Sequence, residues 1–273
     1  MGLGGAASLK LMPDAIDHVL IACADPDVAA QAVEAQLGLR ATGSGRHTAL
    51  GTFNRLIWLG DSFIELIGIE ARKLAEASWV GRPVVQAADA GGGFATWAAA
   101  TRVIRDEVKQ VRAIGSDLGD PIAGERVRPD GRILRWVLAA APSLGPLEPP
   151  FLIEHDLTAA EWSPAERDDR AAQDHPIGGP VRFETLELPA PDVPLVTRRY
   201  LRTVGIGPFR PSLAGRGARD ASVGPHTIRI VPNRSAGWPI ATLHLRVAAS
   251  AQPTGTGLRD VELLGCRWLI RAD

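Results

Sequence analysis

Apolar residues along this chain fall into short runs that predict strands, and each set of strands opens with a strand followed by a helix. Residues 15–23 are mostly apolar, as in a buried strand, and Asp25-Pro26-Asp27 then offers a helix N-cap with proline in the first turn. The helix is expected to end at Gly38, because glycine readily adopts the left-handed conformation of a helix C-terminus. Three further strand-like runs follow, at residues 39–42, 51–59 and 63–69. The pattern therefore predicts a βαβββ unit over residues 15–70.

The same pattern returns after an insertion at residues 71–91. A strand-like run at residues 94–100 precedes a helix that Thr101 can cap, and two more strands flank a Pro-Asp-Gly turn before the closing strand. Residues 92–157 therefore predict a second βαβββ unit. Together the two units are expected to form a domain of paired modules over residues 15–157.

The rest of the chain follows this pattern less clearly. Residues 1–14 open with a run of glycine and alanine, and we expect them to be disordered. Residues 158–180 are highly charged and lack strand periodicity, which favours a linker. Residues 181–273 begin with an alternating strand and a second Pro-Asp-Val helix start, so they predict a further α+β module, a candidate third βαβββ copy. The predicted fold class is α+β, with tandem βαβββ modules and a third, weaker module.

Composition and charge narrow the class of protein. The chain has 30 basic and 31 acidic side chains, so it lacks the positive excess that attracts nucleic acid. No apolar run approaches the roughly 18 residues of a membrane span, and the first residues lack the pattern of a signal peptide. Cys23 and Cys266 lie far apart on apolar stretches, which favours buried thiols over a disulfide. We therefore expect a cytoplasmic protein whose partner is a small-molecule substrate, with no nucleic acid and no membrane.

Each unit has a similar segment with a glutamate near its end. These segments are Phe63-Ile64-Glu65-Leu66 in the first unit and Phe151-Leu152-Ile153-Glu154 in the second. Strand alternation directs Glu65 away from its apolar neighbours, so that it can enter a cleft while they fill a core, and the same holds for Glu154. If the strand register differs by one residue, His155 takes the place of Glu154. The alternative is that both glutamates face solvent on half-exposed strands.

Two βαβββ units in tandem, with a histidine in the first strand and a glutamate in the fourth, resemble the vicinal oxygen chelate superfamily. The segments that look like its glyoxalase-like subgroup are Ile16-Asp17-His18-Val19, Gly45-Arg46-His47, Gly51-Thr52-Phe53-Asn54-Arg55-Leu56, Phe63-Ile64-Glu65-Leu66, Arg128-Pro129-Asp130-Gly131, Leu134-Arg135-Trp136 and Phe151-Leu152-Ile153-Glu154. The resemblance covers residues 15–156. It implies modules that curve around a cleft, where ligands from first and fourth strands hold a divalent metal against two neighbouring substrate oxygens.

Carried over by position, the resemblance implies His18, Glu65 and Glu154 as ligands of Zn, Mn, Fe or Ni. The matching first-strand position of the second unit falls within residues 94–96, none of which is a good ligand, so water or substrate oxygens would complete the site. With Glu65 or Glu154 as the base, a metal-stabilised enolate would make the protein a lyase or isomerase of a small 2-oxo or vicinal-oxygen compound.

His47, Asn54 and Arg55 are candidate substrate-binding residues. His47 lies in a glycine-rich loop, where substrate contacts often concentrate. Asn54 and Arg55 begin the third strand, where the arginine fork could bind a carboxylate or phosphate. Plain surface placement is the alternative for all three.

A second hypothesis is a metal-free protein of the same fold that binds and sequesters a small aromatic or hydrophobic compound. The missing fourth ligand and the tryptophans of the strands, Trp58, Trp97 and Trp136, support this interpretation, although ordinary core packing also explains those side chains. A third hypothesis gives the C-terminal module a role in assembly, such as a homodimer. It predicts that residues 1–157 alone lose oligomerisation while they keep any activity.

Overall fold

The computed structural model describes residues 13–127, 131–159, 162–233, 237–248 and 259–272. Almost all of the N-terminal segment that we expected to be disordered lies outside the described residues. Within the described ranges the protein is α+β, as predicted, and its strands form two sheets.

The first sheet contains two βαβββ modules. The first module consists of β1 (Ala15–Ala22), α1 (Pro26–Leu37), β2 (Gly43–His47), β3 (Thr52–Leu59) and β4 (Ser62–Ile69). The second module consists of β5 (Gly93–Ala100), α4 (Ile104–Ala113), β6 (Ile122–Val127), β7 (Ile133–Ala139) and β8 (Phe151–His155). The strand order β2-β3-β4-β1-β5-β8-β7-β6 joins the modules through β1 and β5, which are antiparallel. The predicted tandem arrangement is confirmed.

Helix α1 illustrates how the local sequence fixes an element. The Asp25 side chain accepts hydrogen bonds from the backbone N–H groups of Asp27 and Val28, which satisfies donors that a helix start leaves without partners. The helix ends at Gly38, whose φ of 69° is left-handed, and the Gly38 N–H bonds to the carbonyl of Glu34. This start and this end agree with the sequence expectation.

The strand expected at residues 39–42 is not formed. Instead, the chain after α1 bonds to a segment much later in the sequence, since the Arg40 N–H donates to His175 and the Ile177 N–H donates to the Gly38 carbonyl. Leu39 is buried in the core, so its apolar character reflects packing rather than strand pairing. The strand begins only at Gly43.

The insertion between the modules forms two short helices, α2 (Arg72–Ala77) and α3 (Gly81–Asp89). The side chains of Val84 and Ala87 on α3 are buried against the first sheet. The insertion therefore belongs to the folded body of the first sheet rather than to a loop.

The second sheet is built from the C-terminal part of the chain. Its elements are β9 (Val181–Ala190), α6 (Val193–Val204), β10 (Arg210–Pro211), β11 (Arg219–Val223), β12 (His226–Pro232), β13 (Thr242–Val247), β14 (Arg259–Leu263) and β15 (Cys266–Ala272), in the strand order β10-β11-β12-β9-β13-β15-β14. The parallel pairing of β9 with β12 repeats that of β1 with β4, and β13 pairs with β9 and β15 as β5 pairs with β1 and β8. The pairing pattern of the first sheet thus recurs in the second sheet.

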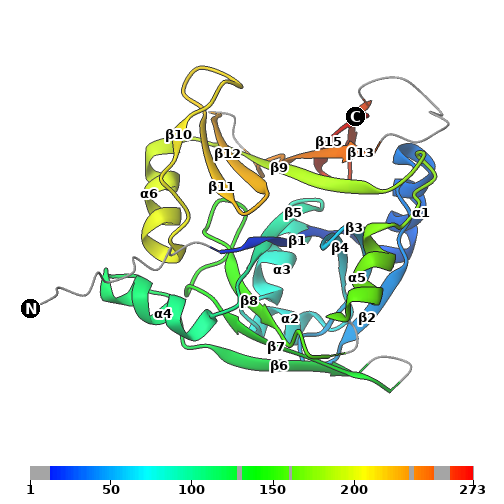
Figure 1. Cartoon of the computed structure of the whole chain (residues 1–273), viewed down its shortest axis with the longest axis horizontal. Coiled ribbons are helices and arrows are strands. Elements are labelled where there is room, and N and C mark those ends of the chain that lie inside the picture. Colours follow the sequence, from blue (N-terminus) through cyan, green and yellow to red (C-terminus); the bar gives the residue numbers. More distant parts are fainter. Residues whose placement is uncertain (1–12, 128–130, 160–161, 234–236, 249–258, 273) are drawn as a thin grey trace, which may run out of the picture.

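The two sheets share one hydrophobic core. Figure 1 shows β9 and its neighbours over one side of the first sheet, and the largest cluster of buried apolar side chains draws on both sheets. Trp97 of β5 and Tyr200 of α6 meet inside this core, where the Trp97 Nε1–H donates to Tyr200 Oη at 3.4 Å. Each of the longest described helices, α1 and α6, has 12 residues, and no described helix has the length and apolarity needed to cross a bilayer.

The segment at residues 158–180 is more than the linker that its composition favoured. It contains helix α5 (Pro164–Ala171), which contacts β3, and Ser163 caps the helix by accepting from the Glu166 N–H. The His175 side chain is buried, and its Nε2 atom lies 2.9 Å from the Trp58 carbonyl oxygen. Arg170 of α5 lies against the rings of Trp58 and Trp162, so the segment packs onto the first module.

Candidate functional site

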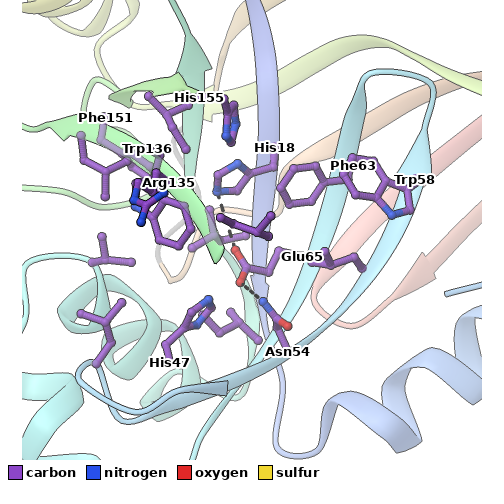
Figure 2. A pocket seen from close by; sticks show the side chains of 18 of the residues that line it. His18, His47, Asn54, Trp58, Phe63, Glu65, Arg135, Trp136, Phe151 and His155 are labelled. Carbon is purple, nitrogen blue, oxygen red and sulfur yellow. Dashed lines mark hydrogen bonds and ion pairs between the residues drawn. The ribbon is translucent and has the colours of Figure 1, made fainter. Parts of the chain in front are cut away.

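A cavity of about 140 Å³ lies on the face of the first sheet that points away from the second sheet. Figure 2 shows its labelled side chains, which converge from both modules. The residues that line it are His18, Leu20, His47, Leu50, Asn54, Leu56, Trp58, Phe63, Glu65, Ile67, Val80, Leu134, Arg135, Trp136, Leu138, Phe151, Ile153, His155, Ala159 and Trp162. Most of the wall is apolar, and its buried polar groups gather around His18 and Glu65.

Strand alternation in β4 positions Glu65. Ile64 and Leu66 are fully buried in the core between the sheets, whereas Phe63, Glu65 and Ile67 line the cavity. The Glu65 side chain is nevertheless shielded, and the residue is only 6% exposed. A carboxylate thus stands on the cavity side of a strand whose other side is packed.

His18 is held in place by the residue before it. The His18 Nδ1 and Asp17 Oδ1 atoms are 2.6 Å apart, and the His18 ring stacks on Phe63 with ring centroids 4.6 Å apart. Adjacent strand residues normally point to opposite faces, but the pairing of β1 with β5 shifts between Ile16 and His18, which makes Asp17 the extra residue of a β-bulge. The bulge lets both side chains meet.

Asp17 also binds the second module. Its Oδ2 lies 2.9 Å from Nε2 of His155, the last residue of β8, and Asp17 is 4% exposed. Burial by itself would raise the pKa of the Asp17 carboxyl, but the charges and hydrogen bonds of His155 and His18 outweigh burial and hold that pKa well below its ordinary value. Because an ionised carboxylate has no hydrogen to donate, His18 Nδ1 and His155 Nε2 are the donors.

On its cavity side, His18 faces Glu65. The His18 Nε2 and Glu65 Oε2 atoms are 3.7 Å apart, and the Asn54 amide nitrogen donates to Glu65 Oε1 at 2.5 Å. With Nδ1 donating to Asp17, Nε2 is the ring atom that His18 presents to the cavity, and in the neutral ring this atom carries a lone pair. Four polar side chains therefore form one buried row: Asn54, Glu65, His18 and Asp17.

Glu154 lies outside this group. Its Oε2 accepts the Ile104 N–H at 2.7 Å, so the carboxylate satisfies a donor at the start of α4, and Glu154 is not among the residues that line the cavity. The parallel pairings show why: Phe63 is opposite His18 in the first module, and Phe151 is opposite Ala98 in the second. The second segment has one more residue between its phenylalanine and its glutamate.

The matching positions of the second module follow from these pairings. Ile153 corresponds to Glu65, and Ala98, rather than a residue within 94–96, corresponds to His18. His155 rather than Glu154 faces the site. The strand register of β8 is therefore the alternative one, shifted by one residue.

The donor set does not fit the divalent metal that the resemblance implies. Among the described residues no group of three or more His, Cys, Asp or Glu side chains is arranged to hold a metal ion. His18 and Glu65 would supply two ligands, whereas catalytic zinc sites usually have three protein ligands. The second module offers the apolar side chains of Ala98 and Ile153 at the corresponding positions.

The three candidate substrate-binding residues do not all face the cavity. His47 and Asn54 line the cavity, and His47 Nδ1 lies 3.1 Å from Thr52 Oγ1. Arg55 points elsewhere: its guanidinium pairs with Asp27 along an outer groove that adjoins the cavity. Its position on β3 next to Asn54 explains this, because neighbouring strand residues face opposite sides.

Sequence reasoning did not give a role to Asp17 or to Trp162. Trp162 follows β8 and lies against His155, with ring centroids 4.4 Å apart. Asp17 stands directly before His18, and a carboxylate beside a candidate histidine was the available signal, but strand alternation alone directs it to the other face.

Paired βαβββ modules around a cavity, with a first-strand histidine and a fourth-strand glutamate, define the class of this protein as the vicinal oxygen chelate superfamily. The chain belongs to the family described as the glyoxalase-like domain, whose model matches residues 16–204. No curated protein matches the chain.

A solved structure shows the same fold over most of the chain. A hypothetical protein from Staphylococcus aureus is similar over 94% of this chain and 99% of its own length, with a TM-score of 0.75 at 15% identity. A methylmalonyl-CoA epimerase of Streptomyces coelicolor, in complex with 2-nitronate-propionyl-CoA, matches 53% of this chain and 96% of its own at 20% identity, with a TM-score of 0.39. The methylmalonyl-CoA epimerase from Mycobacterium tuberculosis matches 55% of this chain and 92% of its own at 17% identity, with a TM-score of 0.37.

Proposed function

We propose that this protein is an isomerase or lyase that removes a proton next to the carbonyl group of a small 2-oxo or vicinal-oxygen compound, with His18 as the base. The observation that carries the proposal is the 2.6 Å contact between His18 Nδ1 and Asp17 Oδ1 at the polar end of an apolar cavity. A histidine whose Nδ1–H is held by a buried carboxylate presents Nε2 as a proton acceptor.

Asp17 supports this role in two ways. Its hydrogen bond fixes the ring orientation and the tautomer of His18, and its negative charge stabilises the imidazolium that forms when Nε2 takes a proton. His155 donates to the other oxygen of Asp17 and so holds the carboxylate between the two modules. Asp17 is thus a positioning residue, and His18 is the group that meets the substrate.

Asn54 and Glu65 complete the proposed reaction. The electron pair of the broken C–H bond moves to the carbonyl oxygen, and the second N–H of Asn54 Nδ2 can donate to that oxygen while the first binds Glu65. Return of the proton from His18 to a neighbouring atom gives an isomer, and loss of a group from the adjacent carbon gives a lyase. Glu65, 3.7 Å from His18, can exchange the proton with the imidazole.

The other candidate residues enter the proposal differently. Among the residues that the structure describes, the divalent metal implied by the resemblance has no complete set of ligands, so no step is assigned to it. Glu154 is assigned to the start of α4. His47 stays a candidate for substrate contact, and Arg55 could meet only a substrate that extends into the outer groove.

The proposal is tested by exchange of carbon-bound hydrogen for solvent deuterium. A panel of small enolisable 2-oxo and hydroxy-carbonyl compounds is incubated with the protein in deuterated buffer, and the loss of the α-proton signal is followed by NMR. At least one compound is expected to exchange with the wild type, and His18→Gln is expected to slow that exchange by about 100-fold or more, the usual contribution of a general base. Asp17→Asn should give an intermediate loss.

Two controls make the result decisive. Exchange is expected to continue in the presence of a chelator, and the metal content of protein purified without chelator is expected to be well below one ion per chain. A rate that His18→Gln leaves unchanged, or a rate that disappears with chelator and returns with Zn, Mn, Fe or Ni, would contradict the proposal.

The second candidate function is metal-free binding of a small aromatic or hydrophobic compound. The apolar wall of the cavity, with Trp58, Phe63, Trp136 and Phe151, favours it. Tight binding of such a compound that a chelator does not affect, together with no exchange for any member of the panel, would favour this function over catalysis.

The proposal also keeps the cytoplasmic location and the homodimer that we expected from the sequence. Both cysteines, Cys23 and Cys266, are buried as free thiols, which supports a reducing compartment. Sedimentation of the purified chain measures the oligomeric state.

A further inference from the structure

The buried polar groups at the end of the cavity mainly accept hydrogen bonds. Glu65 offers a carboxylate, and the neutral form of His18 offers the lone pair of Nε2. Asn54 is 5% exposed, and its Oδ1 is a buried atom without a hydrogen-bond partner in the part of the chain that the structure describes. The opposite assignment of the amide would place its oxygen against the Glu65 carboxylate, so Oδ1 is the atom left over.

Asn54 Oδ1 has almost no accessible surface, so a donor placed at this end of the cavity meets Glu65 rather than that oxygen. A buried carboxylate favours such a donor, which adds to the hydrogen bond that Asn54 Nδ2 already gives to Glu65. The polar end therefore favours a ligand with a hydroxyl or similar group.

The charges around the cavity disfavour an anion. In the described ranges no lysine or arginine forms an ion pair with Asp17 or Glu65, whose only charged or titratable contacts are histidines. Arg135 lines the cavity, but its side chain is more than half exposed and lies 3.6 Å from Glu125. An anionic group at the polar end would approach Glu65 without a cation to offset the repulsion.

The wall sets the size and shape of the ligand. Aromatic rings from four strands and from the segment after β8 surround the space, namely Trp58, Phe63, Trp136, Phe151 and Trp162. Its volume of about 140 Å³ is close to that of a cavity of about 150 Å³ that binds benzene in another protein. Flat, unsaturated groups pack well against such rings.

We propose that the cavity binds an uncharged compound of about one ring that donates a hydrogen bond to Glu65, and that it rejects anions of the same size. This inference rests on the proposed function, because it concerns the same site. It makes Glu65 the residue that selects against anions.

Three compounds that share a benzoyl group provide the test. The compound α-hydroxyacetophenone is neutral and donates through its hydroxyl, acetophenone lacks the donor, and phenylglyoxylate carries a negative charge. Binding to the full chain is measured by calorimetry at constant ionic strength. The hydroxyl compound is expected to bind about tenfold or more tightly than each of the others. Equal or tighter binding of phenylglyoxylate would overturn the inference, and so would equal binding of acetophenone.

Glu65→Gln keeps the size of the side chain and removes its charge. The variant is expected to reduce the preference for the neutral compound over phenylglyoxylate by about tenfold, whereas Glu262→Gln, an exposed carboxylate on β14, should leave it unchanged. An unchanged preference in folded Glu65→Gln contradicts the role of Glu65. If that variant does not fold, the three compounds on the wild type still decide the inference.

The binding test and the exchange test can give opposite outcomes. Binding that follows the expected order without any α-proton exchange would retain the inference and remove the proposed reaction. Exchange that depends on His18 but occurs equally well on an anionic compound would retain the reaction and remove the inference.

Discussion

At the residue scale, one extra residue in a strand shapes the polar end of the cavity. The bulge at Asp17 brings two neighbouring side chains of β1 to the same place, so that a carboxylate supports the ring of His18. Without the bulge, Asp17 would point into the core between the sheets, where an unpaired charge is costly. A local irregularity of this kind is typical of functional sites in sheets.

Glu154 is expected to matter for stability rather than for reaction. Glu154→Ala removes the acceptor for the Ile104 N–H and should lower the free energy of unfolding by about 1 kcal/mol. Denaturant unfolding measures the change. Glu154→Gln keeps an acceptor oxygen and should recover most of the lost stability. If Glu154→Ala is as stable as the wild type, this role of Glu154 is wrong.

Glu107 predicts a pH dependence of stability. Burial is the main cause that raises the pKa of its carboxyl to about 7, and the charges of Asp14 and Glu154 add to it, while a hydrogen bond from Thr101 acts in the opposite direction. The folded pKa therefore lies above the ordinary value of 4.5. The stability that protonated Glu107 contributes is full below about pH 4.5 and is lost as the pH rises through about 7.

Glu107→Gln imitates the protonated side chain. The variant is expected to match the wild type near pH 5 and to exceed its stability at pH 8.5 by about 1 to 2 kcal/mol, allowing for screening by solvent. Unfolding in urea at the two pH values checks this. A stability difference that is the same at both pH values would rule out the titration of Glu107 as its cause.

At the element scale, helix α5 packs against two tryptophans of the cavity wall. The Arg170 guanidinium lies 4.7 Å from the ring centroids of both Trp58 and Trp162, so it holds the segment after β8 against β3. Arg167 on the same helix makes an exposed ion pair with Asp61. Exposed ion pairs contribute less than about 1 kcal/mol, whereas stacking on two tryptophans can contribute more.

Arg170→Ala is therefore expected to loosen the segment at residues 158–180. Limited proteolysis should cut this segment several times faster in the variant than in the wild type, because local opening exposes the backbone. Arg167→Ala is the matched control and should change the rate less. Equal rates for Arg170→Ala and the wild type would show that the stacking does not hold the segment.

Helices α1, α4 and α6 and most strands were predictable because each depends on neighbours in the sequence. The cap at Asp25 and the stop at Gly38 are examples, and both are formed. The conformation of residues 39–42 depends instead on His175 and Ile177, more than 130 residues away, for example through the Arg40 N–H. No local pattern reports such a partner.

The candidate site was predictable only in part for the same reason. His18 and Glu65 follow from alternation within their own strands, and they do meet. The position of Glu154 depends on how β8 pairs with β5, which one residue of register decides. The pairing of Asp17 with His155 depends on a bulge that the sequence does not mark.

At the scale of the whole molecule, the shared core couples the two sheets. Tyr200→Ala removes a fully buried ring between them and should lower the free energy of unfolding by about 3 to 5 kcal/mol. Leu201→Ala, at a half-exposed neighbouring position, should change it by less than about 1 kcal/mol. Tryptophan fluorescence and circular dichroism are expected to report one common transition.

Separate transitions for the two sheets, or a small effect of Tyr200→Ala, would contradict the shared core. The same core bears on the hypothesis that residues 1–157 keep activity alone, because that fragment would expose Trp97 and the rest of the core face of the first sheet. The hypothesis that the C-terminal module serves assembly stays a prediction.

The central claim is that the reactive group comes from the first module, with His18 as a base that Asp17 supports and Glu154 outside the site. The most direct test compares His18→Gln and Glu154→Gln in the deuterium-exchange assay, on one compound that the wild type turns over. We expect a loss of about 100-fold or more for His18→Gln and a rate within about twofold of the wild type for Glu154→Gln. Comparable losses in the two variants would show that both residues belong to one reactive centre and would contradict the role of His18 as the base.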